Sequence, residues 1–459
     1  MNNMTEPITI EKPHLTPEIE MEGYKYYKKN ADSFPSAELE TLFQKTENPK
    51  YLSWEELKYK KPYIPSEICP EAYWYALKLF RRSPNSLISQ ISTIEGSWFR
   101  WIKLPRFEKT LHEIDVSLGK KIIETIPLAE KQKREFITEG LIEEAIASSQ
   151  IEGAHTTLEV AKKMIRENRH PTDISQRMIL NNYKIMKRIE NETKNEKLSI
   201  TTLLNLHAEL TNGTLKSKDQ EGRFRRDDEK ISIGNDSDGT TAFVPPNMDF
   251  VTKNLKYFLM FANDEWDIGE RFNFFTHPII KAIMLHFWFA YLHPFVDGNG
   301  RMARALFYWY LLKKGYWIFA YLPISTCIKK SQGQYAKAYL YSEQDDNDLT
   351  YFIDYNIRKI EEAREHFRKF IETKNIGLSN EPELTKKFPT LNPRQIRLIQ
   401  FFRAKPNERT NMSSMVQIYG VTAQTAVKDL KTMEEKGLLY KQKSGLNVFY
   451  YPTDKLLGD

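Results

Sequence analysis

A chain of 459 residues is long enough for two or three domains of ordinary size, so more than one module can be sought in it. Hydrophobic residues at 41% and charged residues at 28% exclude a disordered chain, and only two cysteines, Cys69 and Cys327, argue against a disulfide framework or a cysteine-rich zinc site. The net charge of +6 is concentrated at the C-terminal end, where 13 Lys and Arg stand against 6 Asp and Glu from residue 384 onward, a surplus of 7.

Nothing in the sequence predicts a secretory signal or a membrane span. The N-terminus has neither a basic start nor an apolar stretch. The most apolar run, from Ala282 to Phe295, contains two histidines and is too short to cross a bilayer. We therefore expect a cytoplasmic protein with no membrane partner.

The N-terminal region, residues 1–95, is rich in Tyr, Lys, Glu and Pro, and its prolines predict short helices. The sequence assigns it no role. From residue 96 to about 378 the apolar spacing is mostly helical, which predicts a mainly α core. Within this core, Ile137, Leu141 and Ala145 fall on one stripe of a helix that we expect to end near Ser149.

One segment of the core has a different pattern. Between residues 229 and 245, Ile231 and Ile233 alternate with polar residues and are followed by Gly-Asn and Asp-Gly pairs. This pattern predicts a short β-hairpin among the helices.

A glycine-rich loop follows an apolar helix and precedes another helix. Residues 291–304 read Tyr-Leu-His-Pro-Phe-Val-Asp-Gly-Asn-Gly-Arg-Met-Ala-Arg. Gly298 and Gly300 allow the loop to turn its N–H groups inward, and the next helix adds its positive N-terminal end. Arg301 and Arg304 suit bidentate phosphate contacts. The loop therefore predicts an anion cradle.

Two further residues of the loop add chemistry to the cradle. Asp297 suits a Mg²⁺ ion that keeps most of its waters, and His293 can take a proton from an attacking hydroxyl. Together these residues predict phosphoryl or nucleotidyl transfer. The Gly-x4-Gly-Lys-Ser/Thr pattern of a P-loop enzyme does not occur in the sequence.

The run from His293 to Arg304 resembles the signature of the Fic family of AMP-transferring enzymes, His-Pro-Phe-x-Asp/Glu-Gly-Asn-Gly-Arg-x-x-Arg, at every fixed position. The resemblance extends from about Phe107 to Phe370. It implies that His293 deprotonates a target hydroxyl, which attacks the α-phosphate of ATP and expels pyrophosphate. It also implies Mg²⁺ on Asp297. The nucleotide-binding residues that it implies are Phe295, Gly298, Asn299, Gly300, Arg301 and Arg304, with Gln334 and Tyr335 on the side of the base.

Two other elements resemble regulatory and docking parts of the same family. Ser148-Ser149-Gln150-Ile151-Glu152-Gly153 resembles the autoinhibitory motif Ser/Thr-x-x-x-Glu-Gly/Asn. This resemblance implies that Glu152 pairs with Arg304 and removes a ligand of the γ-phosphate. The predicted hairpin resembles the flap that docks a target segment, with Ile231 and Ile233 as its docking residues.

The resemblance weakens at the base pocket. Family members often present Tyr and Asn on the helix that spans residues 334–342 here, whereas this chain has Gln334, Ala338 and Ser342 with Tyr335 adjacent. Donation of CMP, UMP or GMP, or the phosphocholine transfer of one family branch, therefore stays open beside AMP transfer.

The C-terminal module, residues 384–459, resembles a winged helix-turn-helix domain. Helices are predicted at 394–403, 412–419 and 422–436, followed by strands near 438–440 and 448–450. Binding of double-stranded DNA would use the start of the third helix and the hairpin. The residues expected to contact DNA are Gln424, Thr425, Lys428 and Lys431, with Lys441 and Lys443. Dimerisation or protein docking is the alternative use of such a module.

The sequence thus predicts a mainly α Fic-type core with a β-hairpin flap, bounded at residues 96 and 378, and a C-terminal winged helix. The expected function is transfer of AMP from ATP to a Ser, Thr or Tyr hydroxyl of a target protein or of the chain itself, inhibited in cis by Glu152. The alternatives are a DNA-binding regulator whose core senses a nucleotide without transfer, and an enzyme that removes AMP. A homodimer is left open.

Overall fold

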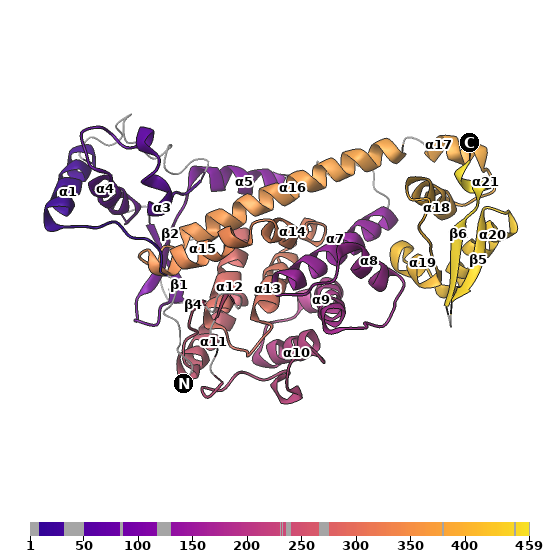
Figure 1. Cartoon of the computed structure of the whole chain (residues 1–459), viewed down its shortest axis with the longest axis horizontal. Helices are drawn as coiled ribbons and strands as arrows, with labels where there is room; N and C mark the ends of the chain where they lie inside the picture. Colours follow the sequence, from indigo (N-terminus) through magenta and orange to yellow (C-terminus); the bar gives the residue numbers. More distant parts are fainter. Residues whose placement is uncertain are drawn as a thin grey trace.

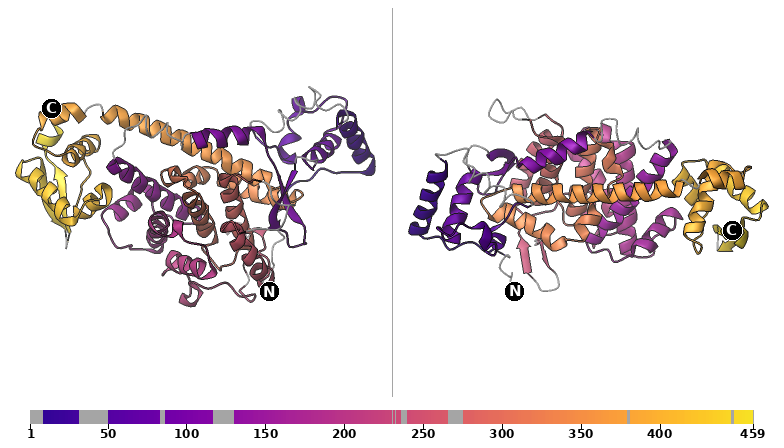
Figure 2. Two further views of the ribbon diagram at one scale, coloured as in Figure 1. Left: turned by 180° about the vertical axis from the view of Figure 1, so that it is seen from behind. Right: turned by 90° about the horizontal axis from the view of Figure 1, so that it is seen from above.

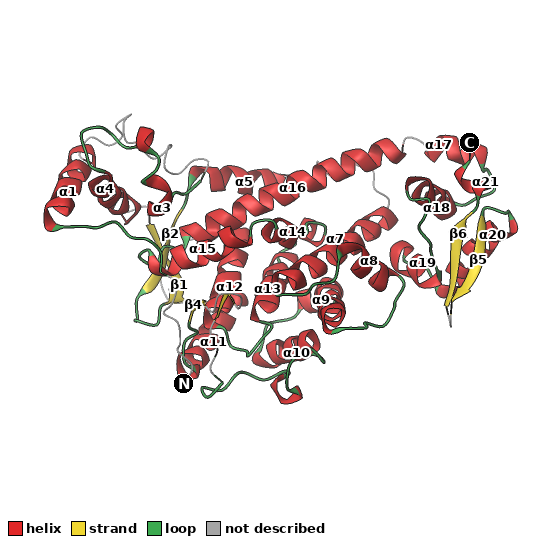
Figure 3. Cartoon of the chain, in the orientation of Figure 1, coloured by secondary structure: helices red, strands yellow, loops and turns green. Residues whose placement is uncertain are grey.

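The computed structural model describes residues 9–31, 50–82, 86–116, 130–229, 231, 233–235, 240–265, 275–378, 381–444 and 447–458. The molecule is elongated and mainly helical, with a helical core between an N-terminal region at one end and a C-terminal domain at the other (Figure 1). Its strands form three separate two-stranded sheets among the residues described (Figure 3). In these same ranges, no helix is both long enough and apolar enough to cross a membrane.

The N-terminal region has a small apolar core of its own. Trp54, Leu57, Tyr73 and Leu77 are buried within it. Its elements are α1 (Pro17–Ala31), α3 (Trp54–Leu57), the 3-10 helix η1 (Lys61–Tyr63) and α4 (Pro70–Arg82). α1 packs against α4. This region is therefore a folded unit, although its composition suggested only short helices.

The first sheet corrects the predicted boundary at residue 95. β1 (Ser86–Ser92) pairs antiparallel with β2 (Trp98–Ile102), so the boundary falls in the loop between two paired strands. Ile91, Phe99 and Trp101 lie in the same apolar core as the central helices. The hairpin therefore belongs to the core. The helical spacing expected from residue 96 was wrong for β2.

The core consists of helices around one continuous apolar cluster. Its helices are α5 (Pro105–Val116), α7 (Glu130–Ile151), α8 (Leu158–Arg166), α9 (Ile174–Asn191), η3 (Thr193–Asn195), α10 (Ile200–Thr211), η4 (Lys218–Gln220), α11 (Met248–Ala262), α12 (Pro278–Leu292), α13 (Asn299–Lys313), η6 (Trp317–Ala320), α14 (Ile324–Lys329), α15 (Gln332–Gln344) and α16 (Thr350–Leu378). α12 and α13 are buried on nearly all sides, as expected of central helices. α16 runs along the long axis of the molecule toward the C-terminal domain (Figure 2).

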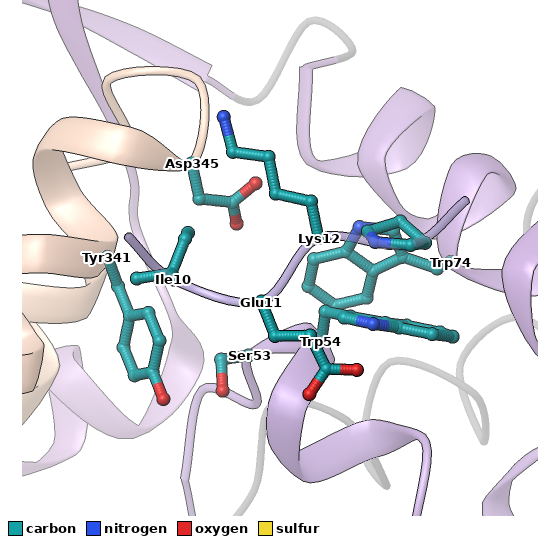
Figure 4. A pocket seen from close by; sticks show the side chains of 9 residues that line it. Ile10, Glu11, Lys12, Ser53, Trp54, Trp74, Tyr341 and Asp345 are labelled. Carbon is teal, nitrogen blue, oxygen red and sulfur yellow. The ribbon is translucent and has the colours of Figure 1, made fainter. Parts of the chain in front are cut away.

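The N-terminal region attaches to the core at α15 and at the start of α16. Lys78 Nζ lies 3.0 Å from an Asp345 oxygen, and the Tyr51 hydroxyl donates to Asp348 at 2.6 Å. A pocket at this junction is lined by residues 10–13, Ser53, both tryptophans of the region, Tyr341 and Asp345 (Figure 4). It contains no residue of the 293–304 loop.

The predicted hairpin in the core is present. β3 (Ile233–Asn235) pairs antiparallel with β4 (Thr240–Phe243), and Ile233 lies opposite Phe243. Ile231 precedes β3 and is not part of the strand. Residues 230, 232 and 236–239 of this segment lie outside the described residues. The Phe243 ring lies 5.6 Å from that of Tyr291, two residues before the 293–304 loop, so the hairpin adjoins that loop.

Helices flank the predicted boundary between the core, which ends at residue 378, and the C-terminal module, which begins at residue 384. α16 continues to Leu378, and α17 spans Glu381–Lys387. The segment that forms α17 is rich in good helix formers, and its proline stands in the first turn, where the missing N–H costs little.

The C-terminal domain has a separate apolar core built on Ile399, Phe402, Met415 and Leu430. Its elements after α17 are α18 (Pro393–Ala404), α19 (Met412–Tyr419), α20 (Ala423–Glu435), β5 (Leu439–Ser444), β6 (Asn447–Pro452) and α21 (Asp454–Leu457). The three helices and two strands expected from the sequence are therefore present within a few residues. Residues 445 and 446, where the turn was expected, lie outside the described ranges.

An ion pair joins the C-terminal domain to the core. Arg409 donates to both Glu167 oxygens, from Nε and Nη2, at 2.9 Å each, and the Glu167 side chain is only 3% exposed. The Arg409 guanidinium also lies 3.7 Å from the centre of the Phe449 ring. Nearby, the Ser414 hydroxyl donates to the Arg166 carbonyl at 3.0 Å. These contacts place α19 against α7 and α8.

We predict that Arg409→Ala lowers the free energy of unfolding by about 2 kcal/mol, because it removes two hydrogen-bond donors from a buried carboxylate. The loss is moderate because Arg169 Nε lies 2.7 Å from the same carboxylate. Urea denaturation of the variant, of Glu167→Gln and of the double variant would measure it. The double variant should lose less than the sum of the single losses; additive losses would contradict a direct pair.

Candidate active site

The loop between α12 and α13 is held in shape by its two ends. His293 closes α12 in the left-handed conformation, with φ 47°, and Gly298 begins α13 with φ 85°. Arg225, which is buried, donates from Nε to the His293 carbonyl at 2.8 Å and from its backbone N–H to the Pro294 carbonyl at 2.9 Å. Arg225 therefore fixes the start of the loop, and the sequence analysis missed it.

The Asn299 side chain closes the loop through two hydrogen bonds to the backbone of Phe295. Its Oδ1 accepts from the Phe295 N–H at 3.0 Å, and its Nδ2 donates to the Phe295 carbonyl at 2.8 Å. The side chain is buried, so its first role in this structure is to close the loop. Contact with a phosphate stays a prediction that rests on the second N–H of the amide.

His207 supports the loop from α10. Its ring stacks on that of Phe295, with centroids 3.7 Å apart and planes 5° from parallel. Nδ1 accepts from the Gly222 N–H at 3.0 Å, and Nε2 donates to the Asp297 carbonyl at 2.9 Å, which fixes one neutral tautomer. Burial lowers the pKa of His207 to about 4, so the ring stays neutral near pH 7. The sequence analysis missed this residue because a histidine on an apolar helix carries no local signal.

Phe295 requires a correction. We placed it among the nucleotide-binding residues, but its side chain is fully buried between His207 and Phe224. In this structure the Phe295 ring packs inside the core beneath the loop backbone, and its side chain is not available to a ligand.

His293 has the protonation state that a base needs. Its Nδ1 lies 3.3 Å from the Ala290 carbonyl, which can only accept, so the proton of the neutral ring is on Nδ1. Nε2 is then left with a free lone pair. Burial lowers the pKa of His293 to about 4, so the neutral form predominates at neutral pH. The residue is available to accept a proton.

Two buried guanidinium groups lie at the start of α13. The side chain of Arg301 is 0% exposed and that of Arg304 is 3% exposed. Nε and Nη1 of Arg301 and Nη1 of Arg304 have no hydrogen-bond partner within the part of the chain that is described. Burial lowers the pKa of Arg301, which measures the cost of keeping this cation out of water. Unpaired donors on buried cations are rare, and an anionic ligand would satisfy them.

The predicted inhibitory motif reaches Arg304. The Ser148 hydroxyl accepts from Arg304 Nε at 2.8 Å, the Ser148 carbonyl from Nη2 at 2.8 Å, and Glu152 Oε1 from the same Nη2 at 2.9 Å. Burial acts to lower the pKa of Arg304, but Glu152, Tyr335 and Glu144 together outweigh it, so the pKa is raised. The pairing that the sequence implied is therefore observed.

Glu152 also lies directly over the cradle. A Cβ atom built on Gly300 would overlap the Glu152 carboxylate, so a larger residue at this position would require the carboxylate to shift. Gly153, with φ 91°, turns the chain away immediately after it. The carboxylate thus stands at the positive end of α13, where the loop would bind an anion.

Asp297 faces solvent beside the cradle. Its side chain is 51% exposed, Oδ1 accepts from the Gly298 N–H at 2.5 Å, and Oδ2 lies 3.5 Å from Arg301 Nη2. Oδ2 of Asp297 therefore makes only a weak contact in this structure. An exposed carboxylate next to a phosphate cradle fits Mg²⁺, which keeps several waters and takes few protein ligands.

The two residues expected near the base differ in their surroundings. The Tyr335 hydroxyl lies 2.8 Å from His286 Nε2 and 3.2 Å from the Tyr339 hydroxyl. Burial raises the pKa of Tyr335 and the charge of Arg304 opposes that rise, so Tyr335 adjoins the arginine. Gln334 is exposed on the same helix. The structure thus brings Tyr335 next to Arg304, and a contact of Gln334 with the base stays a prediction.

Comparison with known proteins finds similarity in the region of the chain that contains this loop. Residues 197–311 match the model of the Fic/DOC family. The chain is similar to a protein adenylyltransferase Fic from Aedes aegypti, with 28% identity over 123 residues, 27% of this chain and 21% of that protein. It is also similar to protein adenylyltransferase fic-1 from Caenorhabditis elegans, with 26% identity over 123 residues, again 27% of this chain and 21% of that protein. The chain therefore spans about a fifth of the length of these curated relatives.

Two solved structures resemble the chain over more of its length. A Fic family protein from Desulfovibrio desulfuricans G20 has 21% identity and a TM-score of 0.49, covering 76% of this chain and 97% of that one. Fic-1 from C. elegans has 13% identity and a TM-score of 0.46, covering 78% of this chain and 98% of that one. The family match contains the whole loop from His293 to Arg304. Residues 197–311 are therefore the part of this chain that matches the Fic/DOC family.

Proposed function

We propose that this chain transfers AMP from ATP to a hydroxyl group of a target protein or of itself. The observation that carries the proposal is the pair of buried arginines with unpaired donors at the start of α13, a few residues after a histidine whose Nε2 is free. A triphosphate supplies the anions that these donors lack. The curated relatives named protein adenylyltransferase support the reaction type.

Each residue of the loop has a separate role in the proposed reaction. His293 Nε2 accepts the proton of the target hydroxyl, and the oxygen attacks the α-phosphorus of ATP. The bond from that phosphorus to the oxygen bridging to the β-phosphate breaks, and pyrophosphate leaves. Arg301 and Arg304 bind the outer phosphates, with the N–H groups at the start of α13. Asp297 would hold Mg²⁺, which neutralises phosphate charge when bound.

Glu152 inhibits the reaction in cis under this proposal. Its carboxylate takes one arginine donor and stands over Gly300. A γ-phosphate and this carboxylate would be two anions competing for one guanidinium, and like charges so close repel. ATP can therefore bind productively only when the end of α7 releases Arg304.

The hairpin β3–β4 is the proposed docking element for the target, because its Phe243 ring lies against Tyr291 beside the catalytic histidine. The edge of a two-stranded sheet can pair with an extended segment of another chain. Ile231 and Ile233 remain the residues proposed to contact it.

We predict that His293→Ala lowers label transfer from α-labelled ATP at least about 100-fold, because a positioned general base contributes about that much. Transfer would be measured in the Glu152→Gly background with Mg²⁺, and γ-labelled ATP in parallel should give no label. His170→Ala removes an exposed histidine and serves as the matched control. Equal incorporation with and without His293 would contradict its role as the base.

We predict that Glu152→Gln and Glu152→Gly raise label transfer about tenfold or more, since a charge-assisted hydrogen bond contributes about 1.5–3 kcal/mol. Glu143→Gln is the matched control, because Glu143 lies on the same helix and pairs with Lys162 instead. An unchanged rate in both Glu152 variants, with ATP bound, would rule out inhibition by this carboxylate. Label in no variant would favour a nucleotide sensor or another donor nucleotide.

A second function is proposed for the C-terminal domain, binding of double-stranded DNA in the manner of a winged helix. α20 begins after Thr422, whose hydroxyl accepts from the Thr425 N–H at 3.2 Å. Gln424, Lys428 and Lys431 are exposed along this helix and line a shallow hollow with Val427. Lys441 is less available, because its ammonium lies 3.0 Å from Glu434.

We predict that Lys428→Ala and Lys431→Ala each weaken binding to a DNA duplex and reduce the slope of log affinity against log salt by about 1. Fluorescence anisotropy over a range of salt concentrations would measure both quantities. Lys405→Ala, an exposed lysine at the end of another helix of the domain, is the control. Wild-type slopes in both α20 variants would show that this helix does not contact DNA.

A further inference from the structure

Three metal-ligating side chains meet outside the catalytic loop. Cys327 comes from α14, and Glu362 and His366 come from successive turns of α16. One ligand atom from each lies within 4.8 Å of the others, and Cys327 Sγ is 3.7 Å from His366 Nδ1. Among the residues that the structure describes, this is the one group of three or more such side chains close enough to share a metal ion.

The spacing of the group fits zinc. Tetrahedral zinc holds sulfur at about 2.3 Å and nitrogen at about 2.0 Å, which places two such ligands about 3.6 Å apart. The observed separation of Cys327 Sγ and His366 Nδ1 is 3.7 Å, so both could bind without rearrangement. A thiolate, an imidazole and a carboxylate suit zinc, whereas Mg²⁺ and Ca²⁺ take oxygen ligands.

A neighbouring lysine supports the same interpretation. Lys359 Nζ donates to Glu362 Oε2 at 2.8 Å, and its own side chain is largely buried. Because a carboxylate has two oxygens, Glu362 can keep this bond while Oε1 ligates a metal. Ligating carboxylates are commonly oriented by such an outer hydrogen bond.

A nucleophilic Cys–His pair is the competing interpretation of the short Cys327–His366 distance. Cys327 is 0% exposed, so no substrate can reach its sulfur. His366, in contrast, is exposed and gives a small ion access from solvent. The group is therefore suited to holding an ion and not to attacking a substrate.

We propose that Cys327, Glu362 and His366 bind one Zn²⁺, with a water molecule in the fourth position, and that the ion clamps α14 to α16. Hydrogen bonds connect the clamped helix α14 to α7. The Ser325 N–H donates to Glu144 of α7 at 2.9 Å, and Lys329 donates to Gln150 at 2.6 Å, two residues before Glu152. The ion thus fixes the helix on which the inhibitory end of α7 rests.

The test uses the purified full chain, stripped with a chelator and dialysed against Zn²⁺, and then separately loaded with Co²⁺. Zinc content per chain is measured by atomic emission. The cobalt form is examined for tetrahedral d–d bands and for a thiolate-to-cobalt charge-transfer band. Neither readout requires nucleotide transfer, so a failure of the zinc proposal can be distinguished from a failure of the proposed function.

The expected result is one Zn²⁺ per chain and a charge-transfer band in the wild type and in Cys69→Ser, the matched cysteine control. Cys327→Ser should lose the band, and His366→Ala should bind Zn²⁺ at least about tenfold more weakly, the loss that even an outer partner can cause. Because His366 is exposed, its variant reports on the site even if Cys327→Ser fails to fold. Absence of the charge-transfer band in wild type, or unchanged affinity in His366→Ala, would overturn the proposal.

Discussion

The burial of two arginines at the start of α13 is the constraint on which the rest of the site depends. A guanidinium out of water needs anions or acceptors around it, and the described structure supplies too few. Ser148 and Glu152 supply acceptors to Arg304, while Arg301 has only a weak contact with Asp297. The proposed polyanionic ligand would fill this deficit, and Ser148 and Glu152 at the end of α7 already fill part of it.

The geometry of the loop follows from hydrogen bonds and a ring stack that do not involve the two buried arginines of α13. Asn299 closes the loop on the backbone of Phe295, and His207 stacks beneath that ring while donating to the Asp297 carbonyl. Arg225 holds the carbonyls that follow α12. These contacts fix where the N–H groups at the start of α13 point before any ligand arrives. A preorganised cradle costs little reorganisation when charge develops during transfer.

The N-terminal region and the C-terminal domain each pack against a helix of the core that leads to the proposed site. The N-terminal region contacts α15, the helix of Tyr335, and the C-terminal domain contacts α7, the helix that ends at Glu152. Cys327, Glu362 and His366 lie where α14 meets α16, and α14 in turn supports α7. The helix that leads to Glu152 therefore contacts several core helices and the C-terminal domain. This arrangement explains how binding elsewhere on the chain could reach Arg304 without touching the loop.

The sequence by itself determined the residues that carry contiguous signals. The His293–Arg304 run, the Ser148–Gly153 motif and the elements of the C-terminal domain could all be located from local pattern, because glycines, caps and apolar spacing act over a few residues. Only the tertiary structure decided what depends on distant partners. His207 and Arg225 hold the loop from 86 residues and 68 residues before His293, and Cys327 meets its two partners from another helix. The boundary at residue 95 was wrong for the same reason, since β1 and β2 are joined by hydrogen bonds and by a shared core that no local composition reveals.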